Sequence, residues 1–213
     1  QDGKVFIKSD YSPKSAKKIP MSAELAFSSC AVPSITVMPL GENRPLYTQK
    51  EFFKAEGTIK IGDRLFFMNE NSVGIIDDHK GYYSMHMHYD WLTGMGVVNG
   101  SPLGFNLCKN QAEEPEKHSE NLLWLNGECH LLPPVDFEHL PDGTWHVFDK
   151  YGAVDIMFEI DDAYNLVRGF GPVSTKYIAP FGNIKGFAKD LNGNKIVLDG
   201  LCGMGEDITV TRM

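Results

Sequence analysis

Short segments in which apolar and polar residues alternate make up much of the chain. The alternation is clear from Lys4 to Lys8, and it recurs over residues 58–61, 64–68, 72–76, 144–148, 154–158, 195–198 and 208–211. Successive side chains of a β-strand point to opposite faces, so this pattern is typical of strands with one buried and one exposed face. It therefore predicts half-buried antiparallel strands, since the strands of a buried parallel sheet are apolar throughout.

Turn-forming dipeptides separate these segments at short intervals. They lie at residues 62–63, 99–100, 126–127, 142–143, 151–152 and 192–193. Several are Asn-Gly or Asp-Gly, which supply the positive φ angles that tight hairpins need. Helical periodicity is almost absent, so the hairpins predict an all-β antiparallel meander that closes into a barrel, with a sandwich as the alternative.

Two regions depart from this pattern. Residues 110–121 are acidic, contain Pro115 and carry no apolar stripe, which predicts an exposed loop. The start of the chain is rich in lysine and proline, with Lys14, Lys17 and Lys18 lying between Pro13 and Pro20. We therefore expect residues 1–46 to be N-terminal strands or an extension, and residues 47–213 to form the barrel.

The composition is that of a globular protein. Of the 213 residues, 42% are hydrophobic, 23% charged and 11% aromatic, which excludes disordered, collagen-like and coiled-coil classes. The net charge of −8 leaves no basic stripe for phosphate binding, so nucleic acid is not an expected partner. No segment approaches the roughly 18 consecutive apolar residues of a transmembrane helix. The chain begins with Gln1, so we expect a processed or truncated start, and the compartment stays open.

The four cysteines are widely spaced. Cys30, Cys108, Cys129 and Cys202 form no Cys-x-x-Cys pair, which argues against a structural zinc site and against a dense disulfide framework. We expect free, mostly buried thiols in a reducing compartment, which slightly favours the cytoplasm; two disulfides are the alternative.

Residues 79–91 contain three of the seven histidines. On a strand, His86 and His88 project to the same face and can approach one metal ion or one ligand. A closed zinc site needs three or four protein ligands. Spacing identifies no third one, and His130 or Glu120 would reach the pair only if the barrel folds that way. We therefore expect no metal and no cofactor, with both histidines on a solvent face or in core hydrogen bonds as the simplest alternative.

Three polar residues are candidates for a buried site. An inward-pointing Asn106, Glu120 or Asn121 must find a hydrogen-bond partner, because burying it alone costs about 1–3 kcal/mol. A carboxylic acid in an apolar barrel has a raised pKa and can protonate an alkene or activate water, so Glu120 and Asp78 are the candidate general acids. The alternative is that Glu120 and Asn121 cap the loop before the next strand.

Aromatic residues on the alternating segments are candidates for a cavity wall. We place Trp91, Trp124 and Phe105 around a small hydrophobic ligand, with Asn106, Asn121, His86 and His88 as polar contacts. Core packing is the alternative for the aromatic residues. The sequence contains no GxSxG, HExxH or GxxxxGK[ST] motif, which argues against hydrolase and nucleotide-binding functions.

From Tyr47 onward, the order of short motifs resembles the family called domain of unknown function 2804. The matching features are Thr48-x-Lys50 with Gly57, Asp78-x-x-Gly81, Trp91 before a glycine-rich strand, Gly104-x-Asn106-Leu107, Glu120-Asn121 with Trp124 and Gly127, and the closing Phe181-Gly182, Gly186 and Gly203-x-x-Glu206. Each motif is short, and their shared order over about three quarters of the chain carries the resemblance.

The resemblance implies lipocalin-like (calycin) β-barrels, distantly similar to the two-lobed carotenoid hydratase and lipocalin-type Diels-Alderase proteins. It implies that this chain is the second lobe together with the end of the first. Three functions follow as expectations: binding of a small hydrophobic molecule; a cofactor-independent hydratase, isomerase or cyclase acting through Glu120 or Asp78; or a structural subunit that joins a partner lobe or a larger assembly.

Overall fold

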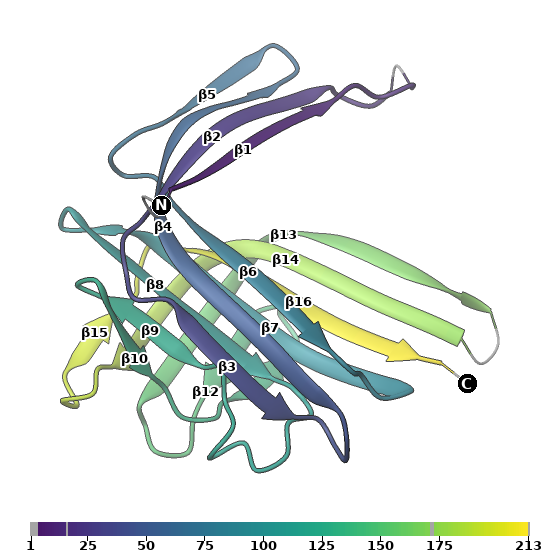
Figure 1. The fold of residues 1–213 in the computed structure, drawn as a ribbon, viewed down its shortest axis with the longest axis vertical. Coiled ribbons are helices and arrows are strands. Elements are labelled where there is room, and N and C mark those ends of the chain that lie inside the picture. The colour runs from purple at the N-terminus through teal and green to yellow at the C-terminus, as the bar shows by residue number, and fades with distance from the viewer. Residues whose placement is uncertain (1–3, 16, 171–172, 213) are drawn as a thin grey trace.

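The computed structural model describes residues 4–15, 17–170 and 173–212. These residues form sixteen β-strands in two antiparallel sheets, with no helix among them, so the prediction of an all-β antiparallel fold is confirmed (Figure 1). The same residues contain no helix with the length and apolar character that a membrane-crossing helix requires.

The smaller sheet has six strands and is organised around its longest member, β4. Its strands are β1 (Lys4–Tyr11), β2 (Met21–Ser29), β3 (Ser34–Pro39), β4 (Pro45–Ile61), β5 (Arg64–Met68) and β6 (Val73–Gly81). Residues 45–54 of β4 pair with β3 and β6, and residues 53–61 pair with β2 and β5. The boundary expected after residue 46 thus falls inside β4.

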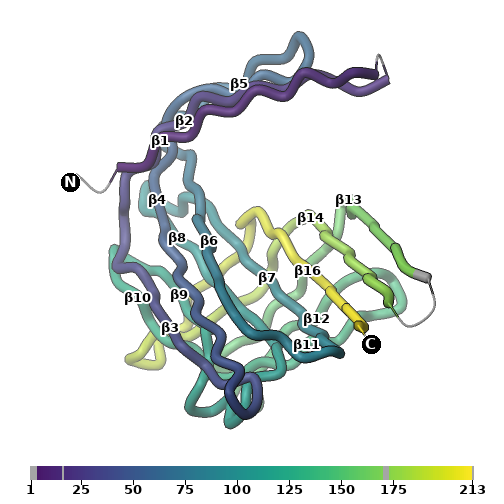
Figure 2. Tube along the Cα trace, turned by 45° about the vertical axis from the view of Figure 1, so that its right-hand side comes forward, coloured from purple at the N-terminus to yellow at the C-terminus, as the bar shows by residue number. Residues whose placement is uncertain are grey.

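One part of this sheet projects away from the rest of the molecule. We call it the arm: β1, β2, β5 and residues 57–61 of β4 (Figures 1 and 2). At the base of the arm, Gly57 has a φ of +125°, and a Cβ there would lie 2.1 Å from the carbonyl oxygen of Glu24 on β2. A side chain at this position would therefore separate β4 from β2.

The larger sheet has ten strands and curls strongly into a half-barrel (Figure 2). Its strands are β7 (His86–Val98), β8 (Ser101–Lys109), β9 (Leu122–Leu125), β10 (Glu128–Leu131), β11 (Asp136–His139), β12 (Trp145–Phe148), β13 (Val154–Phe170), β14 (Val173–Lys189), β15 (Lys195–Val197) and β16 (Cys202–Thr211). The order is β10-β9-β8-β7-β16-β14-β13-β12-β11, with β15 on β14. Among the described residues β10 and β11 do not pair, so the sheet is open there; its curl is consistent with the expected lipocalin-like barrel.

The hairpins lie where the turn dipeptides predict them. Asn99-Gly100 joins β7 to β8 and Asn126-Gly127 joins β9 to β10, and all four residues have positive φ angles of 51° to 83°. This is the backbone of a tight type I′ turn. A simple meander does not describe the whole sheet, however, because the last strand, β16, is inserted between β7 and β14.

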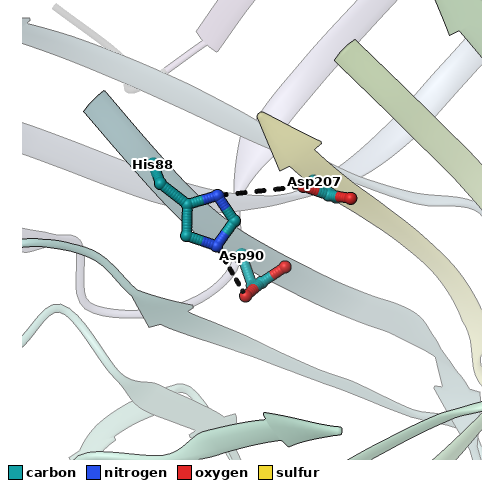
Figure 3. Close-up of side chains that lie close together, drawn as sticks. All are labelled: His88, Asp90 and Asp207. Atoms are coloured by element: carbon teal, nitrogen blue, oxygen red, sulfur yellow. Dashed lines mark ion pairs between the residues drawn. The ribbon is translucent and has the colours of Figure 1, made fainter. Parts of the chain in front are cut away.

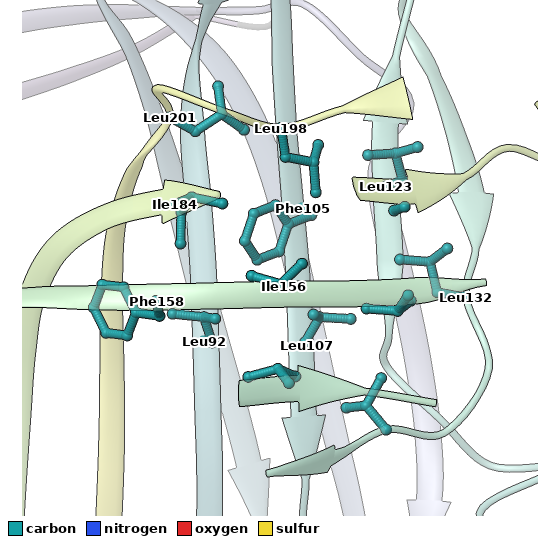
Figure 4. Packing of buried hydrophobic residues seen from close by; sticks show 14 of the residues in the cluster. Leu92, Phe105, Leu107, Leu123, Leu132, Ile156, Phe158, Ile184, Leu198 and Leu201 are labelled. Carbon is teal, nitrogen blue, oxygen red and sulfur yellow. The ribbon is translucent and has the colours of Figure 1, made fainter. Parts of the chain in front are cut away.

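The concave side of the half-barrel holds the main hydrophobic core. Phe105, Phe158, Ile156 and Ile184 are fully buried there, beside leucines from β7, β8 and β9 (Figure 4). A second cluster, built on Phe52, Leu122 and Trp124, packs the smaller sheet against the larger one. Apolar burial thus fixes both the curl and the contact between the sheets.

Two expectations need correction in detail. The described residues of 110–121 form a loop, as expected, but its end is not exposed: Glu120 is 7% and Asn121 1% accessible. The four cysteines are free thiols, as expected, but Cys202 is exposed, while Cys30, Cys108 and Cys129 are partly buried. Asn121 can be buried because its side-chain amide forms hydrogen bonds with backbone groups that have no backbone partner of their own.

Candidate functional site

A cavity of about 220 Å³ lies between the two sheets. Its lining comes from β4 and β6 on one side, from β7, β8 and β16 on the other, and from the loops that follow β3, β6 and β8. Apolar groups supply much of the wall, including Leu46, Met87, Trp91 and Met204. Charged groups reach it from both sheets, namely Lys50, Asp77, Glu120 and Glu206.

Strand alternation on β4 explains why a lysine is buried here. Leu46, Thr48, Lys50 and Phe52 occupy every second position and are all buried, so one face of β4 packs on the larger sheet. Phe52 stacks on Trp124 with ring centroids 5.3 Å apart. Lys50 continues this face and is only 3% accessible.

Two carboxylates neutralise the Lys50 ammonium. Its Nζ lies 2.5 Å from Oδ2 of Asp77, its register partner on β6, and 2.9 Å from Oε2 of Glu120. Burial alone lowers the pKa of Lys50, but the charges of Glu120 and Asp77 outweigh it, so the pKa lies above its usual value of 10.5. Lys50 is therefore charged at neutral pH, and the three groups together carry one net negative charge.

Glu120 is surrounded by hydrogen-bond donors. Besides Lys50, its carboxylate accepts from the hydroxyl of Thr48 at 3.2 Å and from the side-chain amide of Asn110 at 3.1 Å. Three donors around two carboxylate oxygens are the environment of an ionised acceptor rather than of an acid in an apolar pocket.

Two buried asparagines hold this segment in place. Asn106 accepts from the indole N–H of Trp91 at 2.7 Å and donates to the backbone carbonyl of Glu120 at 3.0 Å. Asn121 accepts from the backbone N–H of Cys108 at 2.7 Å and donates to the carbonyl of Pro133 at 2.9 Å. Both side chains therefore bridge segments of the protein and position Trp91 and Glu120.

Tyrosines add hydroxyl groups to the cavity. Burial, followed by the charge of Glu120, raises the pKa of Tyr83 to about 12. Tyr89 donates its hydroxyl to Glu206 at 3.0 Å, and burial together with that carboxylate raises its pKa further. Burial and the charge of Glu120 also raise the pKa of the Cys108 thiol well above its usual value. All three groups are protonated at neutral pH and are hydrogen-bond donors there.

The structure brings together some of the residues chosen from the sequence. Trp91, His88 and Glu120 line the cavity. Phe105 and Trp124 are fully buried in the core, and the indole of Trp124 donates to the carbonyl of Val32.

The other candidates lie elsewhere. His86 is exposed and lies beside the hydroxyl of Thr211, while His130 accepts from the backbone of Leu191. Asp78 is exposed and does not line the cavity, whereas its neighbour Asp77 does, because adjacent residues of a strand face opposite sides.

Sequence reasoning missed Lys50, Asp77 and Glu206 as site residues. A signal for Lys50 is present: a lysine at an inward-facing position between Thr48 and Phe52 of an alternating strand needs a buried counter-charge. Asp77 and Glu206 carry no comparable local signal, since strand pairing alone brings them to the cavity.

The fold and the cavity together define an all-β protein in which part of a six-stranded sheet covers one side of a curled half-barrel, with a charged cluster between the two sheets. The chain belongs to the family described as Domain of unknown function (DUF2804), whose model matches residues 2–211. The match includes residues 2–46, which the motif-based resemblance did not cover. Neither the curated proteins nor the solved structures contain a significant match to the chain.

Proposed function

We propose that the protein binds a small, mostly apolar molecule that carries a hydrogen-bond donor, and that this molecule occupies the cavity between the sheets. The observation that carries the proposal is the Lys50–Asp77–Glu120 cluster beside apolar walls in a 220 Å³ cavity. The cluster and Glu206 make the cavity electronegative, so an amine or hydroxyl group fits it better than a carboxylate.

The energetics of the cluster support a functional role. Apolar residues of similar volume are often as stable as a buried ion pair or more so, because desolvating two charges is expensive. A buried Lys50–Glu120 pair with a second, partly exposed carboxylate from Asp77 is thus a poor device for stability alone. The cavity is smaller than the ~300 Å³ at the lower end of drug-sized pockets, which favours a ligand of no more than about three fused rings or a short chain.

A cavity-filling variant tests the proposal. The probe is 1-aminoanthracene, an apolar fluorophore with an amine donor whose emission increases away from water. We expect saturable binding to the wild-type chain and at least a tenfold loss of affinity in Met87→Trp, which places an indole in the cavity. Val37→Trp adds the same group at an exposed position of β3 and serves as the control. Equal affinities in all three proteins would contradict the proposal.

A second candidate function uses the same cavity. Glu120 reaches it beside Lys50, and its carboxylate, surrounded by donors, favours the role of a general base that takes a proton from a bound alkene or from water in a cofactor-independent hydratase, isomerase or cyclase. Incubation with geraniol in D₂O, followed by mass spectrometry, measures deuterium transfer or water addition. If this function is correct, Glu120→Gln abolishes the transfer and keeps the affinity for 1-aminoanthracene, whereas Asp78→Asn changes neither. Loss of both activity and affinity, or of neither, would exclude it.

A third candidate is a subunit of a larger assembly or the partner of another lobe. The arm favours it, because large apolar side chains on the arm are exposed, including Phe6 at 75% and Phe67 at 69%. Light scattering of the purified chain tests this function: an assembly that Phe67→Ser dissociates supports it, and a monomer contradicts self-assembly.

A further inference from the structure

We propose that His88, Asp90 and Asp207 bind a divalent transition cation of the Zn²⁺ type. The three residues come from two adjacent strands: His88 and Asp90 lie on β7, and Asp207 lies on β16 as the register partner of Asp90. One candidate ligand atom from each residue lies within 4.8 Å of the other two (Figure 3). Asp90 lies two residues after His88 on the same face of β7, and strand pairing supplies the second carboxylate, Asp207, which spacing along the sequence does not place there.

The two carboxylates are buried and incompletely paired. Asp90 is 8% and Asp207 5% accessible. Oδ1 of Asp90 is buried without a hydrogen-bond partner, and Nε2 of His139 lies 3.1 Å from it. Asp207 pairs with Lys176 at 2.9 Å, and that lysine is half exposed. A buried carboxylate without a full set of partners is costly, and a bound cation removes that cost.

The imidazole of His88 is oriented as a ligand. Its Nδ1 lies 3.1 Å from the backbone carbonyl of Ile208. A carbonyl oxygen only accepts, so Nδ1 carries the proton, and in the neutral ring Nε2 presents its lone pair. That lone pair faces Oδ2 of Asp90 at 3.4 Å, a separation that a shared cation would bridge, while Oδ1 of Asp207 lies 3.9 Å from Nδ1 of the same ring. A ring N–H donated to a backbone carbonyl is the usual partner arrangement of a metal-bound histidine.

Distance and ligand chemistry select the type of cation. In a tetrahedral zinc site with bonds of about 2.0–2.2 Å, neighbouring donor atoms are roughly 3.3 Å apart. The observed separation of 3.4 Å between Nε2 and Oδ2 matches this value. One imidazole and two carboxylates form a mixed set that suits Zn²⁺ better than Mg²⁺ or Ca²⁺, and three protein ligands leave one position for water.

His139 and its support lie directly behind Asp90. The His139 ring stacks on Trp145 with centroids 4.4 Å apart and planes 5° from parallel. Trp145 in turn packs on Gly205, where a Cβ would lie 2.7 Å from the indole ring. Because Gly205 lies two residues before Asp207 on the same strand, the close approach of Trp145 places His139 against the proposed site. His139 is a positioning residue for Asp90 and not one of the three ligands.

Metal titration of the whole chain tests the site. After removal of metals with a chelator, the chain is titrated with Co²⁺, followed by visible absorption, and with Zn²⁺, followed by calorimetry. We expect one Co²⁺ per chain, displaced by Zn²⁺. His88→Ala and Asp207→Asn each reduce the affinity by about 100-fold or more, and His139→Ala reduces it by about 10–100-fold. His86→Ala changes an exposed histidine two residues away on the same strand and is the matched control.

Several outcomes would overturn the proposal. One is the absence of Co²⁺ binding to the wild-type chain at millimolar concentration. In that case the positive charge beside Asp90 is a proton on Nε2 of His88 rather than a metal ion. Another is an equal loss of affinity in His86→Ala and His88→Ala. Thermal unfolding without metal separates folding from binding, since a variant that keeps the wild-type midpoint and loses Co²⁺ has lost the site alone.

Discussion

The Nζ atom of Lys50 lies 2.9 Å from Oε2 of Glu120, and this contact joins the two sheets of the protein across the cavity. Lys50 belongs to the long strand of the smaller sheet, while Glu120 is anchored by Asn106 to the larger one. The ion pair therefore links the packing of the sheets to the electrostatics of the cavity, and removing either partner is expected to lower stability.

The first prediction concerns the removal of the buried ammonium. Lys50→Met leaves Asp77 and Glu120 without their cation, so we expect the free energy of unfolding to fall by about 3–5 kcal/mol in urea denaturation. Replacing Glu120 with Gln in the same chain removes one uncompensated charge and is expected to restore part of this loss. Lys8→Met, which breaks the exposed pair with Glu24, is the control and leaves stability unchanged. A single Lys50→Met variant with wild-type stability would contradict the prediction.

The second prediction concerns alkaline pH. The pKa values of Lys50 and Tyr83 are raised in the folded state, so the unfolded chain loses these protons first as pH rises. The stabilisation that these two groups contribute is fully present below their unfolded-state pKa values near 10. It is lost as pH rises through their folded-state pKa values, and that of Tyr83 is about 12. We expect the free energy of unfolding to fall over this range, and less steeply in Tyr83→Phe. The tyrosinate absorbance of the wild-type chain minus that of Tyr83→Phe gives the titration of Tyr83. A midpoint near pH 10 in this difference curve would contradict the prediction.

The third prediction concerns thiol reactivity. Burial and the charge of Glu120 keep the Cys108 thiol protonated, whereas Cys202 is exposed. Thiolate is the reactive form, so iodoacetamide at pH 8 is expected to label Cys202 and to leave Cys108 unmodified in the folded chain. Peptide mass spectrometry identifies the labelled residue, and Cys202→Ser removes the fast reaction. Fast labelling of Cys108 would show that the cavity opens readily to solvent.

The fourth prediction concerns Asn106. Asn106→Leu leaves the indole N–H of Trp91 and the carbonyl of Glu120 without partners in the interior, at about 1–3 kcal/mol each. We expect a total loss of roughly 2–5 kcal/mol in urea denaturation and weaker binding of 1-aminoanthracene, because both positioned groups line the cavity. Asn165→Leu, at an exposed position of β13, is the control. Unchanged affinity in a destabilised Asn106→Leu chain would limit the role of Asn106 to folding.

The strands and hairpins were predictable because their causes are local. Alternation and Asn-Gly turns act within a few residues, and the structure confirms them at Asn99-Gly100 and Asn126-Gly127. The insertion of β16 between β7 and β14 has no local cause, since it depends on which distant strands pair. The open edge between β10 and β11 and the projecting arm are likewise properties of the assembled sheets.

Residues of the candidate site could be predicted only where the sequence of a single segment indicates that they are buried. Glu120 and Trp91 reach the cavity, as expected from polar and aromatic residues on alternating positions. Asp78 shows the limit of this reasoning: an error of one residue along a strand selects the opposite face, and the residue at the cavity is Asp77. The approach of Asp207 to His88 depends on the pairing of β16 with β7, which no spacing in the sequence reveals.

The long strand β4 also has a mechanical consequence. Its seventeen residues run without interruption from the cavity, where Lys50 lies, through Gly57 and into the arm. The arm and the wall of the cavity thus share one continuous strand, with Gly57 at the point where the arm begins. A displacement of the arm is therefore expected to be transmitted along this strand to the segment that carries the buried lysine.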